Sequence, residues 1–318
     1  MGKPIEKWGL FEMTLSGPSG GNPFVDVWLT AEFSMGSKTV KVTGFYDGNG
    51  TYKLRFTLAT LAKAPFNKIR MCVFPKTYSF VDEEPTMYAY VEKGQTKRPN
   101  GTVKRTWDFT RFNPAFFQHL EQRIADLAKL NIEADLIIFH PYDKGRWGFD
   151  SMGVTNDLAY IKYLVARLSV YPNVWWSMAN EFDYIKTKPR EVWDSYSKAV
   201  VDADPYHHLC SIHNGSEYYD NWKPYFTHVS IQNGSTVEDF GRAILLRDAY
   251  RKPIIYDEVC YEGNLPQRWG HLSAEEMTEA FWQGMIAGTY VTHGETYRTP
   301  GDTIFWAEGG KFRKGNAA

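Results

Sequence analysis

Two segments of the chain are the strongest indication of its architecture: Asn173-Val-Trp-Trp-Ser-Met-Ala-Asn-Glu181 and Lys252-Pro-Ile-Ile-Tyr-Asp-Glu258. Each is a run of apolar, β-branched or aromatic residues that ends on a carboxylate. Runs of this length and composition predict buried strands. Buried strands that carry polar side chains at their C-terminal ends are typical of a (β/α) barrel, in which the active site lies at that end.

The chain around these segments alternates predicted strands with predicted helices from about residue 67 onward. Strands are expected at 68–74, 135–140, 174–179, 210–213, 228–232, 253–257 and 289–293. Helices are expected at 114–130, 156–168, 191–203, 237–250 and 274–287. This alternation predicts a parallel α/β sheet, and the number of units predicts a closed barrel of the TIM (β/α)8 type.

The N-terminal region has a different pattern. From about residue 5 to residue 56 polar and apolar residues alternate, and Asp47-Gly-Asn-Gly50 is a turn signal. The pattern predicts a small, partial β-sandwich. We therefore expect a partial sandwich domain at 1–56 and a (β/α) barrel catalytic domain at 57–318.

Glu181 and Glu258 are the candidate catalytic residues. Hydrolysis of a glycosidic bond with retention needs one carboxylic acid to protonate the leaving oxygen and one ionised carboxylate to attack the anomeric carbon. Either glutamate alone reads most simply as a polar residue at a loop entry, but the two together favour this chemistry. Asn180, directly before Glu181, can donate a hydrogen bond to the sugar 2-hydroxyl.

Two motifs carry a family resemblance. Asn180-Glu181 after Val174-Trp-Trp-Ser-Met178, and Glu258 within Pro253-Ile-Ile-Tyr-Asp-Glu-Val259, resemble the acid/base and nucleophile motifs of clan A glycoside hydrolases. More narrowly, the chain from Trp8 to about Phe312 is similar to bacterial clan A enzymes that carry a small β-sandwich before the barrel.

The resemblance implies hydrolysis of β-linked glycosides of plant or microbial polysaccharides or oligosaccharides, with retention and through a covalent glycosyl-enzyme intermediate. Glu181 would be the acid/base after barrel strand four, and Glu258 the nucleophile after strand seven. The chemistry implied requires no metal and no organic cofactor.

The same resemblance predicts a missing strand. If Glu181 follows strand four and Glu258 strand seven, then 68–74 is strand two and strand one is absent, because 57–65 reads as the first barrel helix. The C-terminus is short as well. We expect an internal truncation before strand two, with 68–74 and 289–293 separated by a gap or bridged by residues from 39–56.

Polar and aromatic residues at the predicted strand ends are the candidate substrate-binding groups: Arg70, His140, Asn180, His213, Gln232, His293 and Trp306. In the clan an arginine at the position of Arg70 supports the nucleophile, because a buried cation keeps a carboxylate ionised. A structural ion pair is the alternative for Arg70, and satisfaction by backbone is the alternative for each histidine. Gln232 stands where many clan A enzymes have Tyr or His, and Trp306 stands where the clan often places a Trp beneath the reacting sugar.

Composition excludes several other classes of partner. The net charge of -1 offers no basic field for nucleic acid, and no apolar run approaches the length of a membrane span. The residues Met1-Gly-Lys-Pro-Ile-Glu-Lys7 lack the apolar stretch of a signal peptide, which predicts a cytoplasmic protein. Three widely spaced cysteines indicate neither a disulfide framework nor a zinc cluster. The expected partner is a carbohydrate, and the sequence does not indicate the oligomeric state.

Two other readings stay open. His140, His213 and His293 near a carboxylate also resemble the ligands of a metal-dependent barrel hydrolase, although no His-x-His pair is visible. A barrel that has lost activity with its first strand, and retains only sugar affinity, is the other reading.

Overall fold

Parallel strands in two sheets form the centre of the molecule. The structure is a computed structural model, and it describes residues 10–35, 38–57, 67–77, 84–97, 103–129, 131–232 and 241–297. The first sheet has the order β11-β10-β9-β6, from β6 (Asn67–Cys72), β9 (Ile132–Phe139), β10 (Val174–Ala179) and β11 (Cys210–Ser211). The second has the order β12-β13-β15, from β12 (Val229–Gln232), β13 (Ile254–Glu258) and β15 (Tyr290–Val291). A parallel bridge between His213 and Ser230 connects the sheets. The strands therefore follow one another in chain order, as in a (β/α) barrel.

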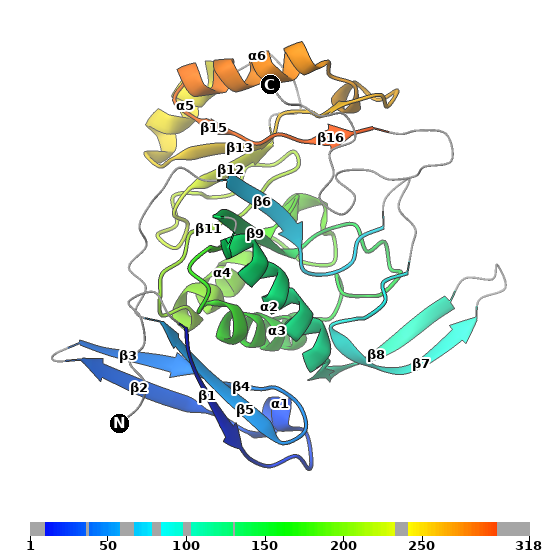
Figure 1. Cartoon of the computed structure of the whole chain (residues 1–318). Helices are drawn as coiled ribbons and strands as arrows, with labels where there is room; N and C mark the ends of the chain where they lie inside the picture. The colour runs from blue at the N-terminus through cyan, green and yellow to red at the C-terminus, as the bar shows by residue number, and fades with distance from the viewer. Residues whose placement is uncertain are drawn as a thin grey trace.

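Helices flank the two sheets (Figure 1). They are α2 (Pro114–Lys129), α3 (Val154–Leu168), α4 (Val192–Ala203), α5 (Gly241–Tyr250) and α6 (Ala274–Ile286). In α2 the apolar residues recur at helical spacing, so that Phe117, Leu120 and Ile124 are buried against the sheet. A capping box formed by Ser273 and Glu276 starts α6. The seven strands predicted from residue 68 onward and the five helices predicted from residue 114 onward each have a counterpart, although β11 and β15 are shorter than predicted. The predicted start of α5 lies in 233–240, outside the described residues.

The parallel array is open within the described residues. The strands β6 and β15 each end their sheet, and no pairing joins them to each other or to the strands of 38–57. This agrees with the predicted gap and not with the predicted bridge from 39–56. The segment read as the first barrel helix lies almost wholly within 58–66, outside the described residues.

Antiparallel strands precede the parallel array. Strand β5 (Thr51–Thr57) lies between β1 (Leu10–Ser16) and β4 (Phe45–Tyr46), while β2 (Thr30–Met35) pairs with β3 (Lys38–Thr43). A single turn of helix, α1 (Pro23–Asp26), follows β1. The antiparallel pairing agrees with the alternating sequence pattern. The partial sandwich and the domain boundary between residues 56 and 57 stay predictions.

A buried ion cluster attaches this N-terminal region to the barrel helices. Arg167 on α3 is fully buried and donates to Glu121 on α2 (2.6 Å) and to Asp47 in the turn after β4 (2.7 Å). The hydroxyl of Tyr163 donates to the backbone carbonyl of Tyr46 (2.7 Å). Lys53 also pairs with Asp47 (2.8 Å), and because Arg167 is fully buried and both carboxylates are nearly so, the removal of one charge destabilises the others.

The sequence reading missed a long hairpin between β6 and α2. Strands β7 (Tyr90–Lys97) and β8 (Val103–Phe112) pair antiparallel and project away from the helices in Figure 1. Tyr90, Trp107 and Phe112 at its base are buried, and Phe149 packs against the first two. A second small pair, β14 (Glu262–Gly263) with β16 (Glu295–Thr296), lies after β13.

Among the described residues no helix has both the length and the apolar character that crossing a membrane requires.

Candidate functional site

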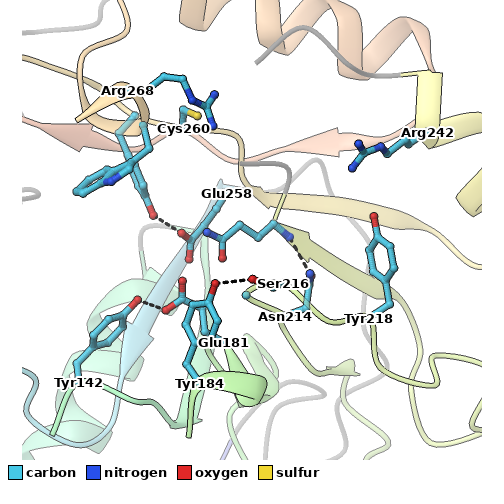
Figure 2. Close-up of a pocket in the computed structure, with 14 residues that line it drawn as sticks. Tyr142, Glu181, Tyr184, Asn214, Ser216, Tyr218, Arg242, Glu258, Cys260 and Arg268 are labelled. Atoms are coloured by element: carbon cyan, nitrogen blue, oxygen red, sulfur yellow. Dashed lines mark hydrogen bonds between the residues drawn. The ribbon is translucent and has the colours of Figure 1, made fainter. Parts of the chain in front are cut away.

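A pocket of about 450 Å³ opens where the parallel strands end. Its walls come from residues that follow or end β9, β10, β11, β12 and β13, which is the C-terminal end of the parallel array. The lining residues are Tyr142, Glu181, Tyr184, Asn214, Gly215, Ser216, Tyr218, Gln232, Arg242, Glu258, Cys260, Tyr261, Arg268 and Trp269. Both candidate catalytic carboxylates therefore face the same pocket (Figure 2).

Glu181 enters the pocket because the chain turns sharply after β10. The strand is buried along its whole length, and Glu181, two residues after it, adopts the left-handed conformation with φ 48°. This conformation is uncommon for a residue with a Cβ atom, and such outliers gather at functional sites. The side chain is 6 % exposed.

Two neighbours hold the Glu181 carboxylate. The hydroxyl of Tyr142 donates to Oε2. With its amide nitrogen facing the carboxylate, Gln232 donates to Oε1 and to the carbonyl of Asn214, both at 3.1 Å. Asn180 lies beside this pair, with its side-chain nitrogen 3.5 Å from the Tyr142 hydroxyl.

The Glu181 carboxyl is poised to carry a proton near neutral pH. Burial raises its pKa to about 7, and the negative charge of Glu258 adds to the increase, while the hydrogen bonds from Tyr142 and Gln232 oppose it. A carboxyl with such a pKa is suited to act as a general acid.

Glu258 reaches the pocket through a β-bulge. Ile231 on β12 faces Tyr256 on β13, but Gln232 faces Glu258, so Asp257 is the extra residue of the bulge. Bulges re-aim side chains next to active sites. Here the extra residue leaves Asp257 buried between the strands and Glu258 at the pocket wall.

Three groups converge on the Glu258 carboxylate. The Tyr261 hydroxyl donates to Oε2 at 2.6 Å, His213 Nε2 lies 3.3 Å from Oε1, and Arg70 Nη1 lies 3.7 Å from Oε1. Burial alone would raise the pKa of Glu258, but these three neighbours outweigh it and hold the pKa at about 2. Between about pH 2 and pH 7, Glu258 is therefore ionised while Glu181 is protonated.

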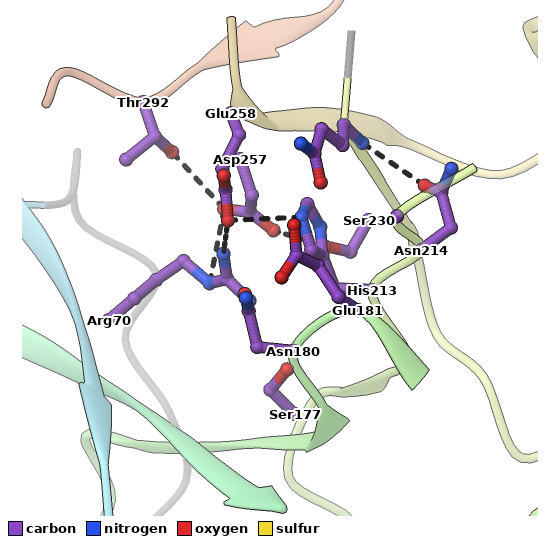
Figure 3. A network of polar contacts seen from close by, with 12 residues as sticks. Arg70, Ser177, Asn180, Glu181, His213, Asn214, Ser230, Asp257, Glu258 and Thr292 are labelled. Atoms are coloured by element: carbon purple, nitrogen blue, oxygen red, sulfur yellow. Dashed lines mark hydrogen bonds and ion pairs between the residues drawn. The ribbon is translucent and has the colours of Figure 1, made fainter. Parts of the chain in front are cut away.

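A buried polar chain runs behind Glu258 (Figure 3). The Nδ1 atom of His213 is 2.9 Å from the Ser230 hydroxyl, and that hydroxyl donates to Asp257. Lys68 forms an ion pair with Asp257, and Thr292 donates to the same carboxylate at 3.2 Å. Burial opposes ionisation of Asp257, but Lys68 and Arg70 dominate, so its pKa lies far below the usual range.

Arg70 and His213, predicted at strand ends, thus lie against Glu258. Arg70 is also within 3.5 Å of Asp135 and 3.8 Å of Asp257, so it is part of an ion cluster as well as a neighbour of Glu258. Arg70 was predicted either to form a structural ion pair or to support the nucleophile, and its contacts fit both predictions.

His140 and His293 lie elsewhere. The two ring nitrogens of His140 contact backbone groups, the carbonyl of Phe74 (3.2 Å) and the amide of Tyr142 (3.1 Å). Burial lowers its pKa to about 4, so the ring is neutral. His293 Nε2 is 3.5 Å from Glu262, and neither histidine lines the pocket. Trp306 lies outside the described residues.

The sequence reading missed Tyr142 and Tyr261, the phenols that hold the two carboxylates. Tyr142 follows His140 at the end of β9, and Tyr261 follows Glu258 by three residues, so both were near predicted strand ends. Their positions near the ends of strands that carry or neighbour the candidate glutamates could have indicated that these tyrosines contact the carboxylates.

The histidines do not form a metal site. Among the described residues, no group of three or more His, Cys, Asp or Glu side chains is arranged to hold a metal ion. The contacts of His140, His213 and His293 are separate from one another.

The chain is similar to proteins of known structure. A candidate glycoside hydrolase from Bacteroides vulgatus, of known structure, is 42% identical with a TM-score of 0.90, and the alignment covers 96% of this chain and 75% of that one. A glycoside hydrolase family 5 protein from Bacteroides vulgatus is 16% identical with a TM-score of 0.50, over 72% of this chain and 52% of that one, which supports the fold alone.

No curated protein gave a significant match. Residues 4–62 match a domain of unknown function, DUF5060. Residues 51–307, most of the 318-residue chain, match the apiosidase-like catalytic domain, and the chain therefore belongs to this family.

Proposed function

We propose that the protein is a retaining glycoside hydrolase that cleaves β-linked glycosides, with Glu181 as acid/base and Glu258 as nucleophile. The observation that carries the proposal is that both carboxylates line one pocket in opposite environments. Arg70, His213 and the Tyr261 hydroxyl lie against Glu258 and lower its pKa, whereas burial and the charge of Glu258 raise the pKa of Glu181. Pairs of carboxyls whose environments separate their pKa values mark the acid and the base of a reaction.

Each step of the reaction uses a group of this pocket. Glu181 protonates the glycosidic oxygen while Glu258 attacks the anomeric carbon, and the glycosyl–carboxylate ester forms as the leaving group departs with the proton. Glu181, now ionised, then takes a proton from water as that water attacks the ester, which releases the sugar and frees Glu258. Every proton given by Glu181 in the first step is regained in the second.

The surrounding residues support these roles. Tyr261, His213 and Arg70 stabilise the negative charge on Glu258 before the attack. We propose that Asn180 and Gln232 contact the sugar, because Asn180 lies beside Tyr142 and Gln232 lines the pocket. His140 contacts the backbone amide of Tyr142, and His293 lies beside Glu262, so contact of either ring with the sugar stays a prediction.

The substrate is a carbohydrate, and the family name directs the first assay to β-apiosides. The panel consists of 4-nitrophenyl β-glycosides that include the apioside, glucoside, galactoside and xyloside. The anomeric configuration of the first-formed product, followed by proton NMR, distinguishes retention from inversion.

Two variants assign the roles of the carboxylates. Glu258→Ala should abolish turnover, and azide should restore part of it by forming an α-glycosyl azide. Glu181→Ala should retain cleavage of substrates with activated leaving groups, which need no proton. Equal behaviour of the two variants on such substrates would contradict the assignment. Sugar binding without turnover in the unaltered chain would instead favour a carbohydrate-binding barrel.

A further inference from the structure

We propose that Tyr184 is the platform of a binding subsite for a sugar ring in the leaving group, on the acid/base side of the pocket. This inference rests on the proposed function and adds to it the chemical class of the leaving group. Tyr184 lines the pocket and is 43% exposed, whereas the two catalytic carboxylates are nearly buried.

The position of Tyr184 along the chain fixes the side of the pocket on which it lies. A short 3-10 helix, Phe182–Tyr184, begins directly after Glu181, so Tyr184 stands next to the acid/base (Figure 2). The acid/base protonates the oxygen of the leaving group and must therefore lie beside that group. His213, Arg70 and Tyr261 all contact Glu258 instead, which leaves the Tyr184 side for the leaving group.

The tyrosine ring is held in one orientation. A Cβ atom on Gly215 would come within 2.6 Å of the ring, so the ring packs directly against the glycine backbone. The Tyr184 hydroxyl is 2.7 Å from the Ser216 hydroxyl and within hydrogen-bonding distance. A ring fixed on one side by a glycine and at its tip by a hydrogen bond loses little entropy when a ligand stacks on its free face.

Asp183 fixes the loop against which the ring rests. Its Oδ1 accepts from the amide of Gly215 (2.6 Å), and its Oδ2 accepts from the amides of Ser216 (2.7 Å) and Glu217 (3.0 Å). Hydrogen bonds to a carboxylate are about twice as strong as those between neutral groups. The loop and the ring are thus positioned before any ligand arrives.

A sugar ring is the ligand that this surface fits. An aromatic ring offers a flat apolar face, and the axial C–H groups of a sugar offer a matching apolar face with hydroxyls around it. Ser216, whose hydroxyl is 2.7 Å from that of Tyr184, and Tyr218 also line the pocket and supply hydroxyls to it. An extended saccharide, rather than a small alcohol, is therefore the expected leaving group.

The experiment compares substrates that differ only in the leaving group. The probes are β-glucosyl, β-galactosyl, β-xylosyl and β-apiosyl fluorides, which have no ring in the leaving group, and disaccharides with the same glycosyl units. Tyr184→Ala should lower kcat/KM on the disaccharide roughly fivefold to tenfold and leave the fluoride within about twofold. Tyr184→Phe, which keeps the ring, should remain close to the unaltered protein on both.

The control variant is Tyr290→Ala, which removes a more accessible tyrosine, 58% exposed, outside the pocket lining. Tyr290→Ala should leave kcat/KM unchanged on both the fluoride and the disaccharide. An equal loss on fluoride and disaccharide in Tyr184→Ala would show a general structural role and overturn the proposal, as would no loss on either.

A binding measurement separates this proposal from the proposed function. Calorimetric titration of the same disaccharides does not need turnover. If the unaltered chain hydrolyses no probe but binds a disaccharide, and Tyr184→Ala alone weakens that binding, the hydrolase proposal fails and the platform stands. Unchanged binding in Tyr184→Ala, or no binding by the unaltered chain, overturns the platform.

Discussion

Removal of the Tyr261 hydroxyl should lower kcat/KM and move the acidic limb of its pH profile to higher pH. In Tyr261→Phe, Glu258 loses a hydrogen bond of 2.6 Å. A hydrogen bond to a charged group contributes about 1.5–3 kcal/mol. If that energy acts on the transition state, kcat/KM falls roughly 10-fold to 150-fold. Because Arg70 and His213 remain in place, the loss should be partial.

The pH profile gives the sharper readout. The Tyr261 hydroxyl stabilises the ionised form of Glu258, so its removal raises the pKa of that carboxyl from about 2. The same free energy moves the acidic limb of kcat/KM upward by about 1–2 pH units. The basic limb, set by Glu181 near pH 7, should stay where it is.

Tyr142→Phe is the matched control, because it removes the corresponding phenol hydroxyl from Glu181. This hydroxyl lowers the pKa of Glu181, so its loss should move the basic limb to higher pH and leave the acidic limb in place. The assay is kcat/KM of an aryl β-glycoside between about pH 3 and pH 10, with far-ultraviolet circular dichroism to confirm folding. A Tyr261→Phe enzyme whose basic limb moves, or whose two limbs stay fixed, would refute the assignment of roles.

Three further results are expected. Glu181→Gln should remove the basic limb near pH 7 from kcat/KM of activated aryl glycosides, and persistence of that limb would assign it to another group. Ser230→Ala should lower kcat/KM roughly tenfold and raise the acidic limb, because His213 loses the hydroxyl at Nδ1 that holds it beside Glu258; a change in KM alone would argue against this. Arg167→Ala should lower the free energy of unfolding in urea by about 3–5 kcal/mol, because Glu121 loses its buried cation and Asp47 keeps Lys53 but loses a second cation, whereas a loss below about 1 kcal/mol would show that the cluster rearranges.

Hydrophobic patterning accounts for the parts of the fold that the sequence predicted. The run Val174–Ala179 is buried at every residue, so its apolar character identified the strand to the residue. The helix at α2 was predicted within one residue, because its apolar face repeats at helical spacing. Short or half-exposed elements such as β15 carry little of this signal.

The hairpin β7–β8 was missed although a signal existed. Trp107-Asp-Phe-Thr110 alternates in polarity, and Pro99-Asn-Gly101 earlier in the chain is a turn signal. The strands are largely exposed beyond their base, so their composition differs from that of the barrel strands and resembles a polar loop.

Sequence identified the two candidate carboxylates and three groups that lie against them, Arg70, His213 and Gln232, but not what aims and holds Glu258. The environment of Glu258 depends on a bulge at Asp257 and on a phenol that returns from the following loop, and neither follows from periodicity. The same limit explains His140, whose place at a strand end was predicted. Backbone hydrogen bonds at both ring nitrogens, which only the folded chain reveals, turn it away from the pocket.

The backbone at Glu181 has a consequence for how such a protein changes over generations. A left-handed residue with a Cβ atom costs ~1–2 kcal/mol relative to the ordinary conformation, and this one also carries a buried carboxyl that Glu258 repels. Glycine at position 181 would remove the backbone strain, the buried carboxyl and its repulsion by Glu258. The resulting protein should be inactive but have a higher melting temperature. Only selection for turnover opposes that replacement. In a lineage that no longer needs the reaction, position 181 should therefore drift before the apolar residues of β10, whose loss would unfold the chain.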